Sequence, residues 1–309
     1  MARLTPILYH YPMSPYSEKI RLVLGALDMG WYSVEVPAQP PRPTLDALAG
    51  GYRRIPVLQI GADLYCDTCL IVDALLEGAS DHPLHPDRMS EQGQSWAARA
   101  EGPVFFASIS SAPKWQILKF LIAGLGPRGT LRFLSDRAAM ARQSRLTPIA
   151  APAARELFSD YLLDLEATLS GQRFVSGIAP GYADFCCYHP IWMAVALTRR
   201  TLHSEYPAVA RWMAAMADFG HGTSQDYAGG SPIAAAKSPP RPIATSHDAK
   251  LSALGRRVRV APSDYGCEPV VGELAAETAD RWVIRRQSAD GITVHLHFPR
   301  QGFDFEWLD

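Results

Sequence analysis

The chain has 309 residues, of which 48% are hydrophobic and 20% charged, a composition typical of a globular protein and not of a disordered one. Its length exceeds the roughly 100–200 residues of one ordinary domain, so two or three domains are expected. Thirty basic and 31 acidic residues give a net charge of −1, which argues against nucleic acid as the main partner because such binders usually carry a basic excess.

The first 80 residues are predicted to combine short strands with amphipathic helices. The predicted strands cover residues 4–9, 31–36, 56–60 and 64–66, and the predicted helices cover residues 16–25 and 67–77. In the first helix, apolar residues recur at helical spacing, and the charged residues Glu18, Lys19 and Arg21 lie between them. The Pro- and Gly-rich residues 37–54 predict a loop with room for one short helix.

From residue 89 to residue 222 the pattern is helical, after a proline-containing linker at residues 79–88. Alternating strand patterns are absent from this stretch. The predicted helices cover residues 152–169, 182–197 and 207–217. We therefore expect a second, all-α domain at residues 89–222.

Residues 223–250 are rich in Gly, Pro, Ser, Thr and Ala, a composition typical of a linker. Residues 251–309 then carry short strand-like runs, with turn signals at residues 264–266 and 289–291. This segment predicts a small all-β domain, either a small barrel or a curled sheet. Its seven basic residues are outnumbered by nine acidic ones, so a mixed, solvated surface is expected there.

Four segments carry motifs that occur together in one enzyme family. They are Tyr11–Arg21 at the first strand-to-helix turn, Arg53–Leu58 before the third strand, Leu64–Val72 at a helix start, and Phe174–Asp184 in the helical region. In this order they resemble the cytosolic glutathione transferases, and most closely the serine-type, tau-like and zeta-like classes. The resemblance covers residues 1–222. It implies a thioredoxin-like α/β domain at residues 1–80, followed by the family's all-helical domain.

The resemblance implies that residues 1–80 bind glutathione. In the family, the residue before a cis proline presents its backbone to glutathione, which here indicates Ile55 and Pro56. Asp67 and Thr68 start a helix, whose exposed amide groups favour an anion such as the γ-glutamyl carboxylate. Both are also ordinary N-cap residues, and the two roles can coexist. The glutathione-binding residues implied are Tyr16, Ser17, Arg54, Ile55, Pro56, Asp67 and Thr68.

Basic residues near the predicted cis proline are candidates for binding the glycyl carboxylate of glutathione. In related classes a basic residue stands where Arg53 and Arg54 precede Ile55, and Arg42 is a weaker candidate for the same carboxylate. The alternative for Arg53 and Arg54 is a solvated surface.

Ser14 stands where the family places the residue that activates the thiol. A free thiol has a pKa of about 8.5 and is mostly protonated at neutral pH, whereas the thiolate is the nucleophile. A hydroxyl that donates to sulfur beside a helix N-terminus stabilises the thiolate. The alternative is that Ser14 only caps the helix, in which case Ser17, Tyr9 or Tyr11 would take the role. Because neither position 14 nor position 17 is cysteine, disulfide reductase chemistry is not expected.

The second substrate is expected to bind between the two domains. Phe106, Ser110 and Trp115 are the candidates for this electrophile pocket, and packing in the core is the alternative for their aromatic rings. Cys66 and Cys69 match a C-x-x-C pattern. They lie at the wrong strand-to-helix turn for a redox motif, and no second ligand pair supports a metal site, so no metal is expected.

Taken together, the sequence predicts a glutathione transferase that conjugates glutathione to a small hydrophobic electrophile. The alternatives are a non-catalytic interaction protein on the same scaffold, and a glutathione-dependent isomerase or dehalogenase. The family resemblance implies a homodimer and a role in detoxification. The absence of a signal peptide and of long apolar runs, and the odd count of five cysteines, favour a cytoplasmic protein without a membrane or nucleic-acid partner. No chemistry can be assigned to residues 251–309.

Overall fold

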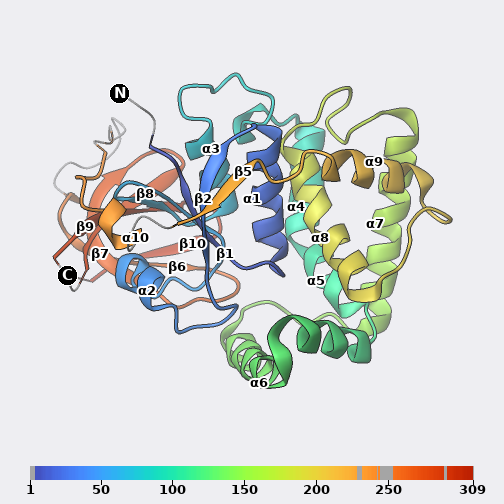
Figure 1. The fold of residues 1–309 in the computed structure, drawn as a ribbon, viewed down its shortest axis with the longest axis horizontal. Coiled ribbons are helices and arrows are strands. Elements are labelled where there is room, and N and C mark those ends of the chain that lie inside the picture. Colours follow the sequence, from blue (N-terminus) through green and yellow to red (C-terminus); the bar gives the residue numbers. More distant parts are fainter. Residues whose placement is uncertain (1–3, 228–231, 242, 244–252, 289–290, 309) are drawn as a thin grey trace.

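The computed structural model describes residues 4–227, 232–241, 243, 253–288 and 291–308. Strands occupy one side of the molecule and a bundle of helices occupies the other (Figure 1). The predicted fold class is confirmed, because an α/β region, an all-α region and a β-rich region follow one another along the chain. Two predicted features lie partly outside the described residues, namely the turn at residues 289–291 and the linker at residues 223–250.

The N-terminal region has the predicted order of strands and helices. Its elements are β1 (Ile7–His10), α1 (Pro15–Ala26), β2 (Gly30–Glu35), α2 (Pro43–Ala49), β3 (Val57–Ile60), β4 (Asp63–Tyr65) and α3 (Thr68–Leu75). β1 runs parallel to β2 and antiparallel to β3, and β3 pairs antiparallel with β4. α2 is the one short helix expected within the loop of residues 37–54. It ends at Gly50 with a φ of 65°, a left-handed conformation that glycine adopts at little cost.

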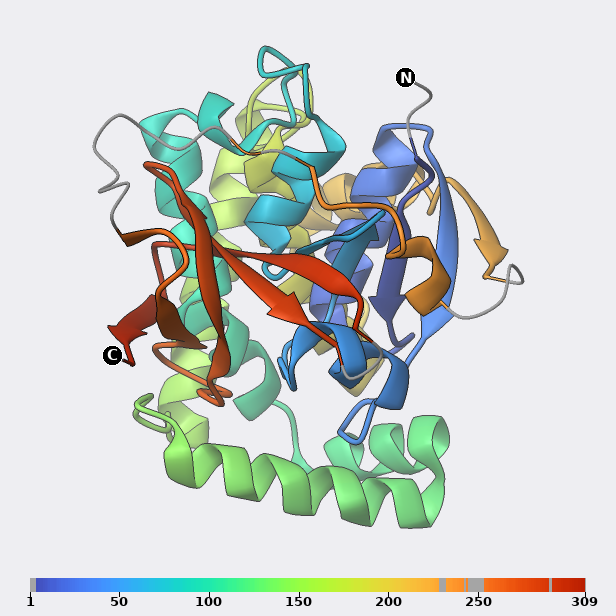
Figure 2. The same ribbon diagram turned by 90° about the vertical axis from the view of Figure 1, so that its left-hand side faces the viewer.

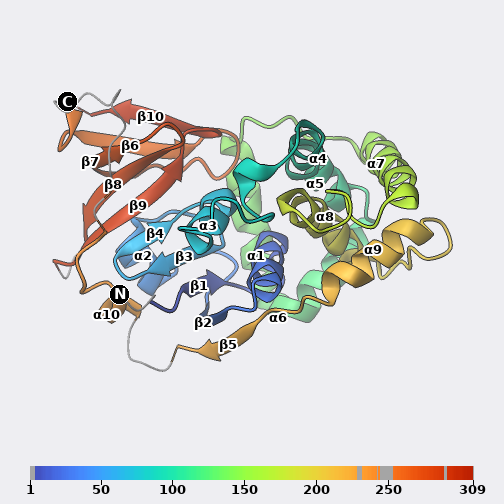
Figure 3. The same ribbon diagram turned by 90° about the horizontal axis from the view of Figure 1, so that it is seen from above.

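α1 is covered on all its sides, which the helical pattern did not predict. It lies between the sheet and the helical bundle and packs against α8 (Figure 3). Its charged residues Glu18, Lys19 and Arg21 are consequently only 6%, 0% and 6% exposed. Buried charges of this kind need partners, and the partners of Lys19 form part of the candidate site.

The helical region begins after a short 3-10 turn, η1 (Pro86–Arg88). Its helices are α4 (Glu91–Glu101), α5 (Pro103–Ser110), α6 (Lys114–Gln143), α7 (Ala151–Gly171), α8 (Tyr182–Thr198) and α9 (Pro207–Ala217). α8 is the central helix, and twelve of its residues are buried. α6 bends where Gly126 takes a φ of 67° immediately before Pro127, because proline cannot continue the helical hydrogen bonds.

Asp184 organises the start of α8. Its carboxylate accepts hydrogen bonds from the backbone N–H groups of Val175, Ser176 and Gly181 and from the indole of Trp212, at 2.7–3.1 Å. Asp184 therefore caps this helix. Gly181 at the N-cap has no side chain to contribute, so the carboxylate alone supplies the side-chain part of the cap.

Part of the stretch assigned to a linker is regular structure. Residues 223–226 form β5 (Thr223–Asp226), which pairs parallel with β2, and residues 232–235 form the single turn α10 (Pro232–Ala235). All four residues of β5 are exposed, so no apolar alternation marks the strand in the sequence. Its backbone pairing with β2 defines it instead.

The C-terminal region continues the N-terminal sheet. Its strands are β6 (Arg257–Pro262), β7 (Val270–Glu277), β8 (Arg281–Gln287), β9 (Thr293–Pro299) and β10 (Phe303–Trp307). β9 pairs parallel with β4, and the ten strands form one open sheet in the order β10-β6-β7-β8-β9-β4-β3-β1-β2-β5. Figure 2 shows that the C-terminal strands twist away from the N-terminal ones. The predicted β region is therefore a curled extension of the first sheet.

The two faces of the N-terminal sheet belong to different hydrophobic cores. Leu8 and Leu58 face α1, α3 and the helical bundle. Tyr9, Val57 and Leu64 face α2 and the C-terminal strands. This alternation follows from the pleat of each strand, which directs successive side chains to opposite faces. The sheet thus joins the helical and C-terminal regions into one molecule.

Candidate functional site

The residues predicted to hold glutathione lie around the N-terminal ends of α1 and α3. Ser14 precedes α1, Thr68 begins α3, and a hydrogen bond from Lys19 to Thr68 connects the two helices. Ile55 forms the predicted cis peptide bond with Pro56 ahead of β3. Ser14, Thr68 and Ile55 are only 2%, 7% and 9% exposed, so little of this site reaches solvent in the described conformation.

Ser14 is the N-cap of α1. Its Oγ accepts a hydrogen bond from the Ser17 backbone N–H at 3.2 Å, which confirms the capping role. This bond uses the oxygen as an acceptor, and among the described residues no acceptor takes the hydroxyl hydrogen. A sulfur atom beside this helix end would receive that hydrogen and the favourable field of the helix dipole. Capping and thiol activation are therefore compatible in Ser14.

Asp67 and Thr68 have different roles at the start of α3. The Asp67 carboxylate accepts from the Cys69 backbone N–H at 2.8 Å, so Asp67 is the N-cap. Burial raises the pKa of Asp67, and the bond from Cys69 opposes this. The Thr68 Oγ1 accepts from the Lys19 ammonium at 3.0 Å. Since a lysine can only donate, the Thr68 hydroxyl keeps its hydrogen for another acceptor.

A buried lysine, Lys19, supports this helix start, although the sequence predicted no role for it in the site. Lys19 donates to Thr68, to the Glu101 carboxylate at the end of α4, and to the Tyr182 hydroxyl at 2.8 Å. Burial alone would raise the pKa of Glu101, but the charge of Lys19, with help from His189, lowers it to about 2. Both members of the pair are therefore charged at neutral pH. Only the position of Lys19 three residues after Tyr16 in the first motif could have drawn attention to it.

The arginines near Ile55 are occupied by other parts of the chain. Arg54 donates to the Asp264 carboxylate and, through Nε at 3.0 Å, to the Tyr265 carbonyl. Arg53 pairs with Asp136 and with Glu268. Both are partly buried, so the solvated-surface alternative is wrong. Both also lie in contact with the loop of residues 263–269 that joins β6 to β7.

Arg42, the weaker candidate for the glycyl carboxylate, has a structural role instead. It is 2% exposed. Its guanidinium donates to the carbonyl groups of Pro37, Ala38 and Arg53 at 2.6–2.9 Å. Because each of the three guanidinium nitrogens of Arg42 donates to one of these carbonyl groups, Arg42 holds the loop around α2 in place.

Aromatic rings form a continuous row from the core of the helical region to the C-terminal region. His189 contacts Tyr16 at 4.5 Å between ring centroids, Tyr16 contacts Phe105 at 4.8 Å, and Phe105 contacts Phe106 at 5.2 Å. Phe106 contacts Tyr265 at 6.1 Å. Tyr16 belongs to the first turn of α1, the helix that Ser14 caps. Phe106 is the only candidate for the electrophile pocket that the described ring contacts place in the row.

The other candidates lie in different settings. Tyr9 is in the core, where its hydroxyl donates to Gln59 at 2.6 Å and burial raises its pKa, so it is not a rival to Ser14. Trp115 is 64% exposed in the first turn of α6 and makes no ring contact with another described aromatic residue. Ser110 ends α5 and is partly buried. Ser17 is fully buried, and its Oγ has no partner among the described groups.

All five cysteines are free thiols. Burial raises the pKa of Cys66, and it raises the pKa of Cys69 to about 12. Thiols with such values stay protonated and are poor nucleophiles and poor metal ligands. The described residues also contain no group of three or more His, Cys, Asp and Glu side chains arranged to hold a metal ion.

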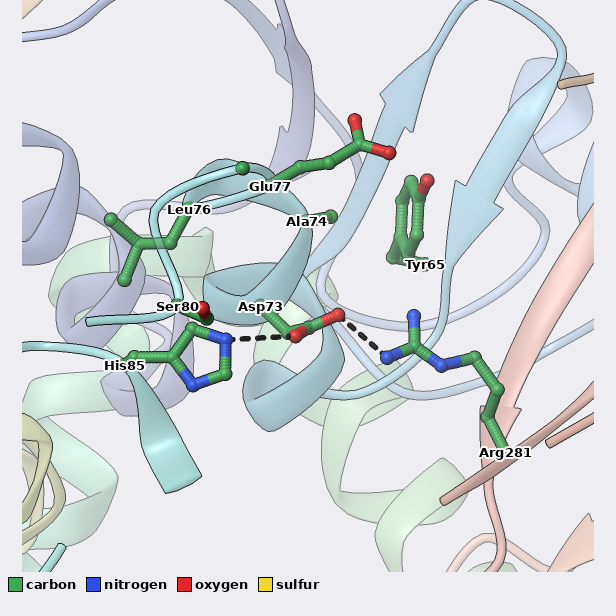
Figure 4. Close-up of a pocket in the computed structure, with 9 residues that line it drawn as sticks. Tyr65, Asp73, Ala74, Leu76, Glu77, Ser80, His85 and Arg281 are labelled. Atoms are coloured by element: carbon green, nitrogen blue, oxygen red, sulfur yellow. Dashed lines mark hydrogen bonds and ion pairs between the residues drawn. The ribbon is translucent and has the colours of Figure 1, made fainter. Parts of the chain in front are cut away.

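A separate cavity of about 300 Å³ lies between α3, the segment at His85 and strand β8 (Figure 4). Asp73 lies between His85 and Arg281 and is bonded to both, at 3.1 Å and 2.6 Å. Glu77 at the rim pairs with Arg241. These polar side chains already bond to one another, and their ion pairs connect the N-terminal, helical and C-terminal regions around the cavity.

Comparisons with known proteins agree with this architecture. Residues 8–83 match the glutathione S-transferase N-terminal domain, and residues 142–218 match the glutathione S-transferase C-terminal domain. A solved structure of a GST-like protein from Pseudomonas syringae is 30% identical, with a TM-score of 0.74. The match covers 97% of this chain and 99% of that one, so it includes the C-terminal β region. None of the curated proteins matches this chain.

Two other solved structures match a shorter part of the chain. A glutathione S-transferase from Pseudomonas fluorescens is 18% identical over 68% of this chain and 93% of its own, with a TM-score of 0.44. A glutathione transferase from Phanerochaete chrysosporium, in complex with oxidized glutathione, is 19% identical over 70% of this chain and 92% of its own, with a TM-score of 0.46.

Among the described residues, no helix combines the length and apolar character needed to cross a bilayer.

Proposed function

The chain belongs to the glutathione S-transferase family, and we propose that it binds glutathione and activates the thiol for transfer to an electrophilic small molecule. The observation that supports this most directly is the Ser14 hydroxyl. It lies at the N-terminus of α1, its oxygen is fixed by Ser17, and its hydrogen has no acceptor among the described residues.

In this proposal glutathione lies across the ends of α1 and α3. The γ-glutamyl carboxylate would take the hydrogen of the Thr68 hydroxyl and the N–H groups at the start of α3. Ile55 would pair with the peptide backbone of glutathione. Lys19 would stay out of direct contact, but its charge behind Thr68 favours an anion at that position.

The chemical step would be a nucleophilic attack by sulfur. The thiol loses its proton to water, and Ser14 donates a hydrogen bond to the thiolate. The sulfur then forms a bond to an electrophilic carbon, and the leaving group departs with the electron pair of the bond that breaks. Each unit by which the thiol pKa is lowered is worth about 1.4 kcal/mol of preference for the thiolate.

Removing the Ser14 hydroxyl tests the proposal. We expect Ser14→Ala to bind glutathione but to lose the ultraviolet absorbance of the bound thiolate near neutral pH, with a conjugation rate about tenfold or more lower. Ser17→Ala is the matched control, because it removes a hydroxyl from the same turn and leaves Ser14 in place. Thiolate formation that survives in Ser14→Ala and disappears in Ser17→Ala would assign the role to Ser17.

A second candidate is a non-catalytic interaction protein, and the nearly closed site favours it. In that case the wild-type protein would not bind glutathione at millimolar concentration. A glutathione-dependent isomerase or dehalogenase would share the thiolate and differ only in the substrates that a screen identifies. We also propose that the protein is a homodimer with a role in detoxification in the cytoplasm, a compartment that keeps glutathione reduced. Light scattering of the purified protein tests the dimer.

A further inference from the structure

The inner side of α6 attaches this long helix to the rest of the molecule. The residues buried there are Leu121, Thr130 and Met140. Asp136 pairs with Arg53, and Arg137 donates to the Ala38 carbonyl at 3.0 Å. These contacts hold the parts of the helix before and after Gly126 against the molecule.

The outer side of α6 carries large apolar side chains. Figures 1 and 2 both show α6 at the lower edge of the molecule, with no other helix or strand below it. In its first half, Trp115, Leu118 and Ile122 are 64%, 45% and 41% exposed. In its second half, Leu131 and Leu134 are 72% and 43% exposed. Because spacings of three and four residues place side chains on one face of a helix, each half presents an apolar stripe to solvent.

The charged residues of α6 are almost all basic. The helix contains six Lys and Arg residues and one acidic residue, although the whole chain has a net charge of −1. Five of the basic side chains are exposed and form no ion pair with a described residue, namely Lys114, Lys119, Arg128, Arg132 and Arg142. The acidic residue is Asp136, which pairs with Arg53 on the inner side. α6 therefore contributes only positive charge to the outer surface.

Exposed apolar stripes flanked by unpaired basic residues are complementary to an anionic bilayer surface. The apolar side chains enter the headgroup region, and Lys and Arg attract the anionic headgroups. A groove in a partner protein is less suitable, because it would surround a helix whose inner side is already attached to this chain. A second copy that packs α6 on α6 is also less suitable, since such a symmetric contact brings basic side chains together.

We propose that α6 is a membrane-binding helix, whose outer side lies on the surface of a bilayer that contains anionic phospholipids. No membrane partner is predicted from the sequence, because it lacks a run of about 20 apolar residues. A helix that lies in the plane of the bilayer surface needs no such run. The inference does not rest on the proposed function, and it gives Trp115 a role at the bilayer instead of in the electrophile pocket.

Co-sedimentation of the wild-type full chain with lipid vesicles tests the proposal. Vesicles of phosphatidylcholine alone are compared with vesicles that also contain about 30% phosphatidylglycerol, at low and at high salt concentration. The double variant Arg128→Gln/Arg132→Gln removes two exposed charges from α6. Arg88→Gln/Lys237→Gln is the matched control, because it removes two exposed charges from other parts of the chain. Leu131→Ser tests the apolar contribution.

We expect the wild type to bind the anionic vesicles at least about tenfold more tightly than the neutral ones, and less tightly at high salt. Binding to the anionic vesicles should be about tenfold weaker in Arg128→Gln/Arg132→Gln, and should change less than about twofold in the control. Leu131→Ser should weaken it about tenfold, because the leucine side chain no longer enters the headgroup region.

Three results would overturn the inference. The first is a wild-type protein that binds neither kind of vesicle or binds both equally, and the second is an equal loss of binding in the two double variants. The third is a different occupant of the outer side of α6. Light scattering that shows a dimer in the wild type and a monomer in Leu131→Ser would identify a second copy, and binding of single-stranded RNA without vesicle binding would identify nucleic acid.

Discussion

At the scale of single residues, Arg54 shows how a predicted ligand-binding side chain can already have a partner within the chain. Its guanidinium donates to the Asp264 carboxylate and to the Tyr265 carbonyl. A carboxylate is also the group at the glycyl end of glutathione. If Arg54 binds that end, as the family resemblance implies, glutathione and Asp264 compete for one guanidinium.

This competition predicts the effect of removing the Asp264 charge. In Asp264→Asn the amide oxygen still accepts a hydrogen bond, but the pairing with Arg54 is weaker because the charge is gone. We expect the affinity for glutathione to rise about threefold to tenfold, measured by calorimetry. Asp304→Asn is the control, since Asp304 pairs with Arg145 on the exposed surface. An affinity that falls, or that rises equally in the control, would show that Arg54 does not bind the ligand.

At the scale of secondary-structure elements, the sequence predicts where elements form better than it predicts their surroundings. Apolar spacing identified α1 within one residue at each end. It did not identify its burial on all sides, because the spacing of Ile20, Val23 and Leu24 is the same for a helix with one covered face as for a helix between two layers. The partners of Lys19 come from α3, α4 and α8, and no local pattern links such distant segments.

Contacts between distant segments also explain why composition did not predict strand β5 or the position of the loop of residues 263–269. β5 has no apolar alternation, since its strand character comes from backbone bonds to β2. The loop that carries Tyr265 was recognised only as a turn signal, because its position beside Phe106 depends on the pairing of β9 with β4. Motifs identified Ser14, Ile55 and Thr68, whereas the contact of Arg54 with this loop could be found only in three dimensions.

The cap of α8 gives a stability prediction at this scale. In Asp184→Ala, four donors that now bond to the carboxylate would lose their acceptor in a buried position. We expect the free energy of unfolding to fall by about 3 kcal/mol or more, measured by urea denaturation. Asp164→Ala is the control, because Asp164 is exposed and pairs with Arg99 at the surface. A loss below about 1 kcal/mol in Asp184→Ala would contradict the role assigned to this cap.

At the scale of the whole molecule, two buried histidines connect stability to pH. The ring of His10 on β1 lies edge to face against the ring of Trp31 on β2. His189 is the first ring of the aromatic row, next to Tyr16. Burial lowers the pKa of each to about 4. His10 accepts a hydrogen bond from Arg21 at 3.1 Å, which fits its neutral form. The His189 nitrogens lack hydrogen bonds, and its distance of 3.8 Å to Glu101 is too long for one.

The sign of the pH effect follows from these lowered values. The unfolded chain takes up protons on both histidines below about pH 6.5, and the folded chain does so only near pH 4. The free energy of unfolding should therefore decrease as the pH falls through this window, by about 2 kcal/mol between pH 7 and pH 5.5. Urea midpoints at the two pH values measure this. His189→Phe should make the decrease smaller, whereas the exposed control His203→Gln should not alter it.

The central claim is that Thr68, with Ile55 and Ser14, forms a glutathione site in the full-length chain. Calorimetric titration of the wild-type protein and of Thr68→Val with glutathione tests it most directly. We predict saturable binding, with one site per chain and a Kd in the millimolar range or tighter, and binding at least about tenfold weaker in Thr68→Val. A wild-type protein that shows no binding at about 10 mM glutathione, or a variant that binds equally well, would contradict the account.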